Sequence, residues 1–318
     1  MWAVLSIQTE YDKPYNTFWK DLQEILISMR TGTFKKKLVW LGYYYSQISN
    51  TAIWIQWDGN QWSFQKTTIH NFLNAVRHGI QMFQTLIQPF PKINKLCILS
   101  SSHGYINRFY TKEHSQSVAL KQIYKQFHKF HIFWDLVILD SCVMSSLENI
   151  IQLSPYAKVL LTYPEFAPWL GMVHATTFSS LFHSNLKTIA TAIGNGMLQR
   201  QKAVLSYPTA FVVIDLKQSI YLAQWLYSHR HLFVYTEPSR LIYCSTKSCK
   251  ESYAIYDLWN VVHYSHLSNK QIQKFNMLFR RSVLQFKTSR HFMNKKKLHG
   301  ISFRKSWNWY PSYLNVNK

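Results

Sequence analysis

The amino-acid sequence predicts an α/β protein in which helices cover a mainly parallel central sheet. Short runs of β-branched and aromatic residues alternate with segments of helical period over the first two-thirds of the chain, as is typical of such sheets. The 318 residues are enough for a sizeable buried core. Hydrophobic residues make up 47% of the chain and charged residues only 16%, which excludes a disordered tail or linker protein.

Each expected strand is a short apolar run bounded by polar or turn-forming residues. The expected strands are residues 2–7, 37–44, 52–57, 95–100, 132–139, 158–161 and 210–214. The expected helices are residues 17–29, 68–86, 115–127, 143–153, 177–182, 186–200 and 217–225. This regular alternation excludes an all-β fold.

A last helix is expected over about residues 269–286. It follows Ser268, a suitable N-cap, and it places apolar residues such as Phe275 and Phe279 on one face. That face is expected to point toward the core rather than toward a membrane.

The alternating pattern ends near residue 214, with no internal repeat and no Gly/Ser linker to mark a boundary. The last third mixes helix with short extended pieces at residues 254–256 and 300–303. We therefore expect a main domain over residues 1–215. A smaller, basic α+β region over residues 216–318 is expected to pack on it.

The cysteine content and the N-terminus suggest a cytoplasmic protein. Four cysteines are too sparse for a disulfide framework in a chain of this length. The apolar run at residues 2–7 has no basic residue before it and is followed by polar residues, so it is expected to be a first strand and not a signal peptide. No apolar run approaches the length that a membrane helix requires, so no transmembrane segment is expected.

Positive charge is concentrated near the C-terminus. The chain has 36 basic and 14 acidic residues, a net charge of +22, and no acidic residue follows Asp257. Such a balance favours anionic partners, either nucleic acid or an anionic surface, and the C-terminal region includes the Lys295-Lys296-Lys297 cluster. A solvated helix face in a basic protein is the simpler interpretation and the one we favour.

The candidate catalytic residues follow the ends of two neighbouring strands. His103-Gly104 follows the strand at residues 95–100, and Asp140-Ser141-Cys142 follows the strand at residues 132–139. Parallel sheets present their functional groups just beyond the carboxyl ends of the strands. A histidine and a cysteine that leave consecutive strands are therefore expected to face one another, as nucleophilic thiol chemistry requires.

Cys142 is expected at the start of a helix, where the helix dipole favours the thiolate. The alternative, a small buried hydrophobic cysteine, is preferred for Cys97, which lies inside a strand. Gly104 has no side chain and so lets the backbone beside His103 approach a substrate closely.

At these residues the sequence resembles the clostripain-like cysteine peptidases, which share their fold with caspases, gingipains and legumains. The family has His-Gly after one strand and a motif of the Asp-x-Cys type after the next, which corresponds here to Asp140 to Met144. The spacing Glu-x-x-Pro-x-x-Gly is kept from Glu165 to Gly171. Residues 256–258 and 300–303 are similar to the family's late Asp-Leu and Gly-Leu-Ser segments.

The resemblance implies a caspase-like three-layer α/β sandwich and a cysteine endopeptidase that cleaves after Arg or Lys. Cys142 would be the nucleophile and His103 the group that protonates the leaving amine. The backbone N–H groups of Gly104 and Cys142 would bind the oxyanion. Asp140 would line the primary specificity pocket and Glu165 would also contact the substrate; a strand-end Asp that caps the next helix is the alternative for Asp140.

Further implications of the resemblance concern processing and metals. Some relatives cut themselves in the loop after the histidine, where Arg108 and Lys112 would be eligible sites. Calcium dependence also occurs in some relatives; no segment here matches a calcium loop, so calcium stays open only as an ion held by acidic ligands from separate segments. Cys244 and Cys249 have no second Cys/His pair near them in the sequence, so no metal is expected at this pair, and no other cofactor is expected.

A second hypothesis is a catalytically degenerate caspase-like protein that binds rather than cleaves. Ser100 to Ser102 before His103, and Tyr105 after Gly104, depart from the family pattern. Such a protein would use its basic C-terminal region to bind nucleic acid or another anionic partner. The retained His103 and Cys142 favour the enzyme.

Overall fold

A computed structural model of the chain describes residues 1–9, 23–25, 27–28, 37–46, 49–105, 108–110, 117–164, 172, 175–204, 209–235, 240–241, 254–288, 299–303 and 310. For some residues within these ranges, His103 among them, only the backbone is described.

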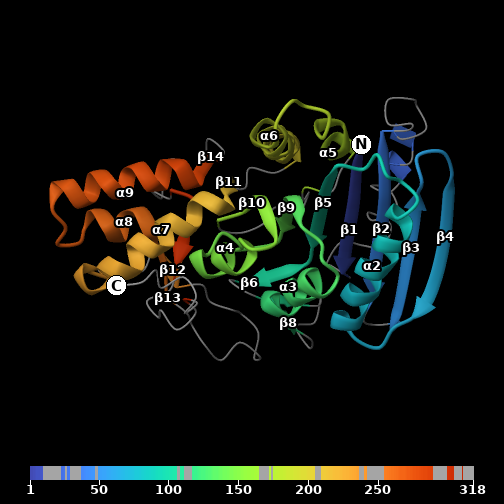
Figure 1. The fold of residues 1–318 in the computed structure, drawn as a ribbon, viewed down its shortest axis with the longest axis horizontal. Helices are drawn as coiled ribbons and strands as arrows, with labels where there is room; N and C mark the ends of the chain where they lie inside the picture. The colour runs from blue at the N-terminus through green and yellow to red at the C-terminus, as the bar shows by residue number, and fades with distance from the viewer. Residues whose placement is uncertain are drawn as a thin grey trace.

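A nine-stranded sheet crosses the molecule (Figure 1). Its strand order is β14-β11-β10-β9-β5-β1-β2-β3-β4. The strands are β1 (Trp2–Thr9), β2 (Leu38–Ser46), β3 (Thr51–Trp57), β4 (Trp62–Thr68), β5 (Lys95–Ser101), β9 (Trp134–Asp140), β10 (Ala157–Thr162), β11 (Ala210–Asp215) and β14 (Val283–Thr288). The five central strands, from β10 to β2, are parallel, and antiparallel strands flank them on both sides.

The central strands are apolar because helices cover both faces of the sheet. In β9 every residue from Trp134 to Asp140 is buried. Alternate β9 residues belong to opposite cores, with Val137 and Leu139 on one face and Leu136 and Ile138 on the other. The sequence of a central strand is therefore a continuous hydrophobic run and does not alternate between apolar and polar residues.

The helices form the two outer layers (Figure 1). The face that carries Leu139 packs against α2 (Phe72–Ile87), α3 (Leu120–Lys129), α4 (Leu147–Leu153), α7 (Leu216–His229), α8 (Leu258–His263) and α9 (Asn269–Ser282). The opposite face packs against α5 (Ala175–Ser180) and α6 (Leu186–Val204). A short 3₁₀ helix, η1 (Arg230–Leu232), follows α7. This is the layered α/β architecture that the sequence predicts.

Two small antiparallel sheets complete the described part of the chain. The first is formed by β6 (His103–Tyr105), β7 (Arg108–Tyr110) and β8 (Ser117–Ala119), with β7 in the middle. The second is formed by β12 (Arg240–Leu241), β13 (Ala254–Asp257) and β15 (Ser302–Phe303), with β13 in the middle. The extended pieces expected near residues 254 and 300 are therefore strands.

All seven expected strands are present with ends shifted by at most two residues, but several helix ends are wrong. The helix expected from residue 68 begins at Phe72 after Asn71, whose side chain accepts a hydrogen bond from the Asn74 N–H, because residues 62–68 form β4. The helix expected from residue 115 begins at Leu120, because residues 117–119 form β8.

The last helix also ends earlier than expected. Ser268 is its N-cap, as predicted, but the helix stops at Ser282, and residues 283–288 form β14, which pairs with β11. The region after residue 215 therefore contributes a strand to the main sheet. Of the helix expected at 17–29, residues 23–25 and 27–28 are described, and they are helical. No helix within the described ranges has the length and apolar character needed to cross a membrane.

Candidate active site

The site is built where β5 and β9, two neighbouring parallel strands, end. In their register Ser101 lies opposite Asp140. Beyond this pair the Ser141 hydroxyl donates a hydrogen bond to the Ser102 carbonyl oxygen (2.6 Å) and accepts one from the Ser102 N–H (3.3 Å). Both serines are fully buried. The residues that follow them, His103 and Cys142, therefore leave the sheet from two tied positions.

Gly104 shows how closely the two segments approach. A Cβ atom built on Gly104 would lie 2.6 Å from the Ser141 Cβ and 3.2 Å from the Cys142 carbonyl oxygen, and it would also overlap the Met144 methyl group. Real side chains do not approach one another this closely, so only glycine fits between β6 and the turn after β9. The backbone beside His103 thus packs directly against the Cys142 peptide.

Cys142 lies in a turn and is half-buried, so solvent reaches part of the residue. The expected start of a helix at residue 143 is wrong: α4 begins at Leu147, and its N-cap is Ser146. Cys142 therefore does not occupy the first turn of α4, where the helix dipole acts most strongly, and the dipole argument for its thiolate no longer applies. The reason for the late start is local, since Val143 has a φ of +55°, outside the helical region.

The turn after Cys142 is strained and needs external support. A β-branched residue at positive φ costs about 1–3 kcal/mol. The Met144 N–H donates to the Tyr163 carbonyl oxygen (3.1 Å), which ties the turn to the end of β10. The Asn149 side-chain amide donates to the Met144 carbonyl oxygen (2.7 Å), which ties the same residue to α4.

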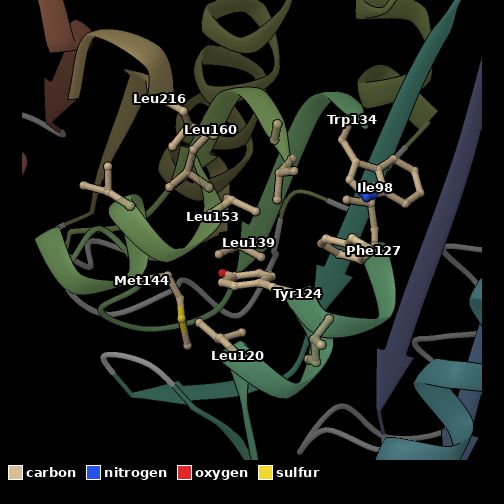
Figure 2. Packing of buried hydrophobic residues seen from close by; sticks show 14 of the residues in the cluster. Ile98, Leu120, Tyr124, Phe127, Trp134, Leu139, Met144, Leu153, Leu160 and Leu216 are labelled. Carbon is tan, nitrogen blue, oxygen red and sulfur yellow. The ribbon is translucent and has the colours of Figure 1, made fainter. Parts of the chain in front are cut away.

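Tyr124, on α3, supports the bond between Asn149 and Met144. Its hydroxyl donates to the Asn149 side-chain oxygen, and in Figure 2 the hydroxyl end of its ring is turned toward Met144. Burial raises the pKa of the Tyr124 phenol, so the hydroxyl keeps its proton and stays a donor. Since Asn149 is fully buried, the network Tyr124–Asn149–Met144 fixes the inner side of the turn.

Asp140, the last residue of β9, is only 4% exposed. The Tyr163 hydroxyl donates to one of its carboxylate oxygens (2.9 Å). The alternative in which Asp140 caps the next helix is wrong, because Ser146 is the N-cap of α4. Asp140 is therefore a carboxylate held by a phenol, two residues before Cys142.

The C-terminal segment reaches the same turn. The Ser302 N–H donates to the Ser145 carbonyl oxygen (3.3 Å), and Ser302 forms a parallel bridge with Ser146. Residues 145–146, which follow the Cys142 turn, are thus paired with a strand some 150 residues away in sequence.

Of the remaining predicted site residues, some lie outside the described part of the chain and one lies in a paired strand. Glu165 and Lys112 lie outside the described residues, as do Cys244 and Cys249. Arg108 lies in β7, paired with Tyr105 on one side and with Ala119 on the other, so cleavage after it would require this strand to leave its sheet. Within the described part of the chain, His, Cys, Asp and Glu side chains form no group of three that could hold a metal ion.

Sequence reasoning missed the residues that hold the turn. Tyr163 directly follows β10, the neighbour of β9, so the strand-end rule that singled out His103 and Cys142 also applies to it. Asn149 and Tyr124 carry no such signal, because their roles depend on packing between α3 and α4.

The fold of the chain is similar to that of proteins of known structure. No protein-family model and no curated protein sequence matches the chain. A solved structure of a secreted C11 cysteine protease from Bacteroides thetaiotaomicron, named iotapain, is similar, with 13% sequence identity, a TM-score of 0.75 and coverage of 95% of this chain and 93% of that one. The chain has the C11 protease fold.

Two further structures with the C11 protease fold match over almost the whole length. One is a secreted C11 cysteine protease from B. thetaiotaomicron in complex with an irreversible peptide inhibitor, with 14% identity, a TM-score of 0.71 and coverage of 98% of this chain and 94% of that one. The other is an inactive zymogen C11 protease from Parabacteroides distasonis, with 14% identity, a TM-score of 0.67 and coverage of 99% and 94%. The α/β sandwich predicted from the sequence is confirmed.

The two described cysteines should differ sharply in reactivity. Burial raises the pKa of the Cys97 thiol, and the nearby Asp135 charge raises it further, whereas Cys142 is half-buried. We expect iodoacetamide at about pH 8 to label Cys142 in the native protein and Cys97 only after unfolding, because the thiolate is the reactive form. Peptide mapping by mass spectrometry separates the two sites. Equal labelling of both thiols in the native protein would contradict the difference in burial between Cys97 and Cys142.

The contact at Gly104 gives a second prediction. Gly104→Ala forces β6 away from Ser141 and is expected to destabilise the protein by about 1–3 kcal/mol. It should also change the labelling rate of Cys142, since the turn must move. Gly79→Ala in α2 is the matched control, because its Cβ would meet the Tyr43 ring at a milder 3.3 Å. Thermal melting and labelling measure both effects, and a Gly104→Ala protein that behaves as the control does would refute the close contact.

Proposed function

We propose that the protein is a cysteine endopeptidase in which Cys142 is the nucleophile and His103 is the general acid. One observation carries the proposal: the backbone beside His103 packs against the Cys142 peptide at the carboxyl edge of a C11 protease fold. Nucleophilic thiol chemistry requires these two residues to share one site. Cys142 is also partly accessible, as an attacking group must be.

In the proposed reaction the Cys142 thiolate attacks the carbonyl carbon of the scissile bond and forms a C–S bond. The π electrons of the carbonyl move to the oxygen, and the resulting oxyanion is to be stabilised by the backbone N–H groups of Cys142 and Gly104. Collapse of this intermediate breaks the C–N bond, and His103 gives its proton to the leaving amine. Water then hydrolyses the thioester, with His103 taking the proton from the water and the Cys142 thiolate leaving.

The proposed substrates carry Arg or Lys before the cleaved bond. Asp140 supports this preference, because a carboxylate two residues before the nucleophile is suited to bind a basic side chain. Its burial matters, since a cation that enters a partly dehydrated pocket needs a compensating charge. The Tyr163 hydroxyl fixes the orientation of that carboxylate. Glu165, which follows Tyr163 by two residues, is proposed as a further substrate contact.

A panel of fluorogenic peptides that end in Arg, Lys, Asp or Ala tests the activity. We expect kcat/KM for the Arg and Lys peptides to exceed that for the Ala peptide by about a hundredfold or more, because the charged partner is missing for Ala. Cys142→Ala should abolish turnover with little change in Tm, since only one sulfur atom is lost. Cleavage of no peptide by folded wild-type protein, or equal cleavage by Cys142→Ala, would overturn the proposal.

Two variants then test the specificity residue. Asp140→Asn still accepts a hydrogen bond from Tyr163 but lacks the charge, so its preference for Arg and Lys over Ala should collapse. Tyr163→Phe is the matched control, because it removes the hydroxyl that orients the carboxylate and keeps the charge. It should raise KM for basic substrates while the preference remains. An unchanged preference in Asp140→Asn would remove Asp140 from the specificity pocket.

A second candidate function is binding to nucleic acid through the C-terminal part of the chain. The observation that favours it lies on α9, where Lys270, Lys274 and Arg281 are exposed, follow one another at helical spacing on one side and have no acidic residue beside them on the helix. Such a row of positive charges suits a phosphate backbone. The Lys295-Lys296-Lys297 cluster lies outside the described residues.

Fluorescence anisotropy with a labelled DNA duplex at several salt concentrations tests this candidate. If these three residues contact phosphates, replacing all of them with Gln should reduce the slope of log K against log salt concentration by about 2–3. Lys121, Lys125 and Lys129 on α3 provide a matched triple control. Equal slopes for the two triple variants, or no wild-type binding at moderate salt, would exclude the α9 face as a nucleic-acid site.

A further inference from the structure

A buried carboxylate in the C-terminal region binds the segment that contacts the Cys142 turn. The side chain of Asp257, at the end of β13, is 2% exposed. One of its oxygens accepts a hydrogen bond from the Asn260 N–H (3.1 Å) and lies 3.0 Å from His299 Nδ1. Its other oxygen accepts from the His299 N–H (2.9 Å). A single carboxylate thus caps α8 and holds both the backbone and the ring of His299.

The residues after His299 link this carboxylate to the candidate active site. Asp257 pairs with Ser302 in the antiparallel register of β13 and β15, and the Leu258 N–H donates to the Ile301 carbonyl oxygen (3.0 Å). On its other side Ser302 bonds to Ser145 and bridges to Ser146. Residues 299–303 therefore form a strap between Asp257 and the end of the Cys142 turn.

The His299 ring has a second contact. It stacks on the Trp259 ring at 5.2 Å between centroids, with an angle of 22° between the ring planes. The His263 ring also stacks on Trp259, at 4.3 Å, and its Nδ1 lies 2.9 Å from the Trp259 carbonyl oxygen. The two histidines share one tryptophan, but only His299 is bonded to Asp257 among the described contacts.

The Cys142 turn depends on bonds from other segments, such as the strap at residues 299–303. Val143 at positive φ makes the turn intrinsically unfavourable, so its shape depends on bonds from outside. Tyr163 and Asn149 hold it at Met144. Its C-terminal end, at residues 145–146, is bonded to Ser302.

We propose that Asp257 and His299 are positioning residues for the nucleophile. They fix the strap at residues 299–303, and the strap fixes the turn that carries Cys142. Neither residue touches the substrate. The kinetic part of this inference rests on the proposed peptidase function, whereas the structural part does not.

Paired substitutions of His299 separate its hydrogen bond from its ring. His299→Phe keeps the stack on Trp259 and loses the Nδ1 donor, whereas His299→Asn places an amide nitrogen near the Nδ1 position and loses the ring. His263→Phe is the matched control, because His263 stacks on the same tryptophan without bonding to Asp257. Asp257→Asn removes the charge but keeps an oxygen that accepts hydrogen bonds.

We expect His299→Phe and Asp257→Asn to lower kcat by on the order of tenfold or more, because small displacements of a reacting group are costly. KM should stay within about twofold, since substrate contacts are untouched. Hydrogen exchange in residues 141–146, followed by mass spectrometry, should quicken by about tenfold in the same variants. His299→Asn should recover most of both properties, and His263→Phe should match the wild type.

The measurements distinguish this inference from its alternatives. Wild-type exchange of residues 141–146 in His299→Phe would overturn it, and so would a His299→Asn variant as impaired as His299→Phe at equal Tm. If Asp257→Asn does not fold, the two His299 variants decide the question. If the wild type cleaves no peptide, the proposed function fails, and hydrogen exchange alone then decides whether the strap positions the turn.

Discussion

The hydrogen bonds between the Ser141 hydroxyl and the Ser102 backbone are the interaction on which the candidate site depends. They extend the β5–β9 pairing by one residue beyond the last strand pair, Ser101 and Asp140. Because both strands run in the same direction, the chain leaves both at the same edge of the sheet. His103 and Cys142 are the next residues on each side, and the missing side chain of Gly104 lets the two segments touch.

The turn itself is held by residues from distant parts of the sequence. Tyr163 follows β10, Asn149 lies on α4, and Ser302 belongs to the second small sheet. Each supplies one hydrogen bond, worth only about 1 kcal/mol. Together they are comparable to the cost of Val143 at positive φ, so the geometry at Cys142 is a property of the whole fold rather than of its own segment.

How much of this the sequence could predict depends on whether a feature is local. Apolar runs identified the main strands, because a parallel strand covered on both faces must be hydrophobic throughout. The end of α9 was missed because Val283 and Phe286 fit both a helical stripe and a strand, and only pairing with β11 decides between them. The positive φ of Val143 and the contact between Asp257 and His299, 42 residues apart, arise from tertiary packing. Neither the positive φ of Val143 nor the contact between Asp257 and His299 leaves a periodic pattern in the sequence.

In the proposed enzyme Asp140, the last residue of β9, would set the specificity, and Cys142, in the turn that follows β9, would be the nucleophile. Asp140 continues the face of β9 that carries Leu136 and Ile138, and the Tyr163 ring packs in the same core. The carboxylate therefore stands at the edge of an apolar layer, where a charge interacts more strongly than it does in water. An arginine or lysine that reaches it lies at a fixed offset from Cys142, because only Ser141 separates the two residues and its hydroxyl is bonded to Ser102. In the proposed enzyme the bond between Ser141 and Ser102 would therefore both bring the His103 backbone to Cys142 and set the distance between the bound basic side chain and the Cys142 sulfur.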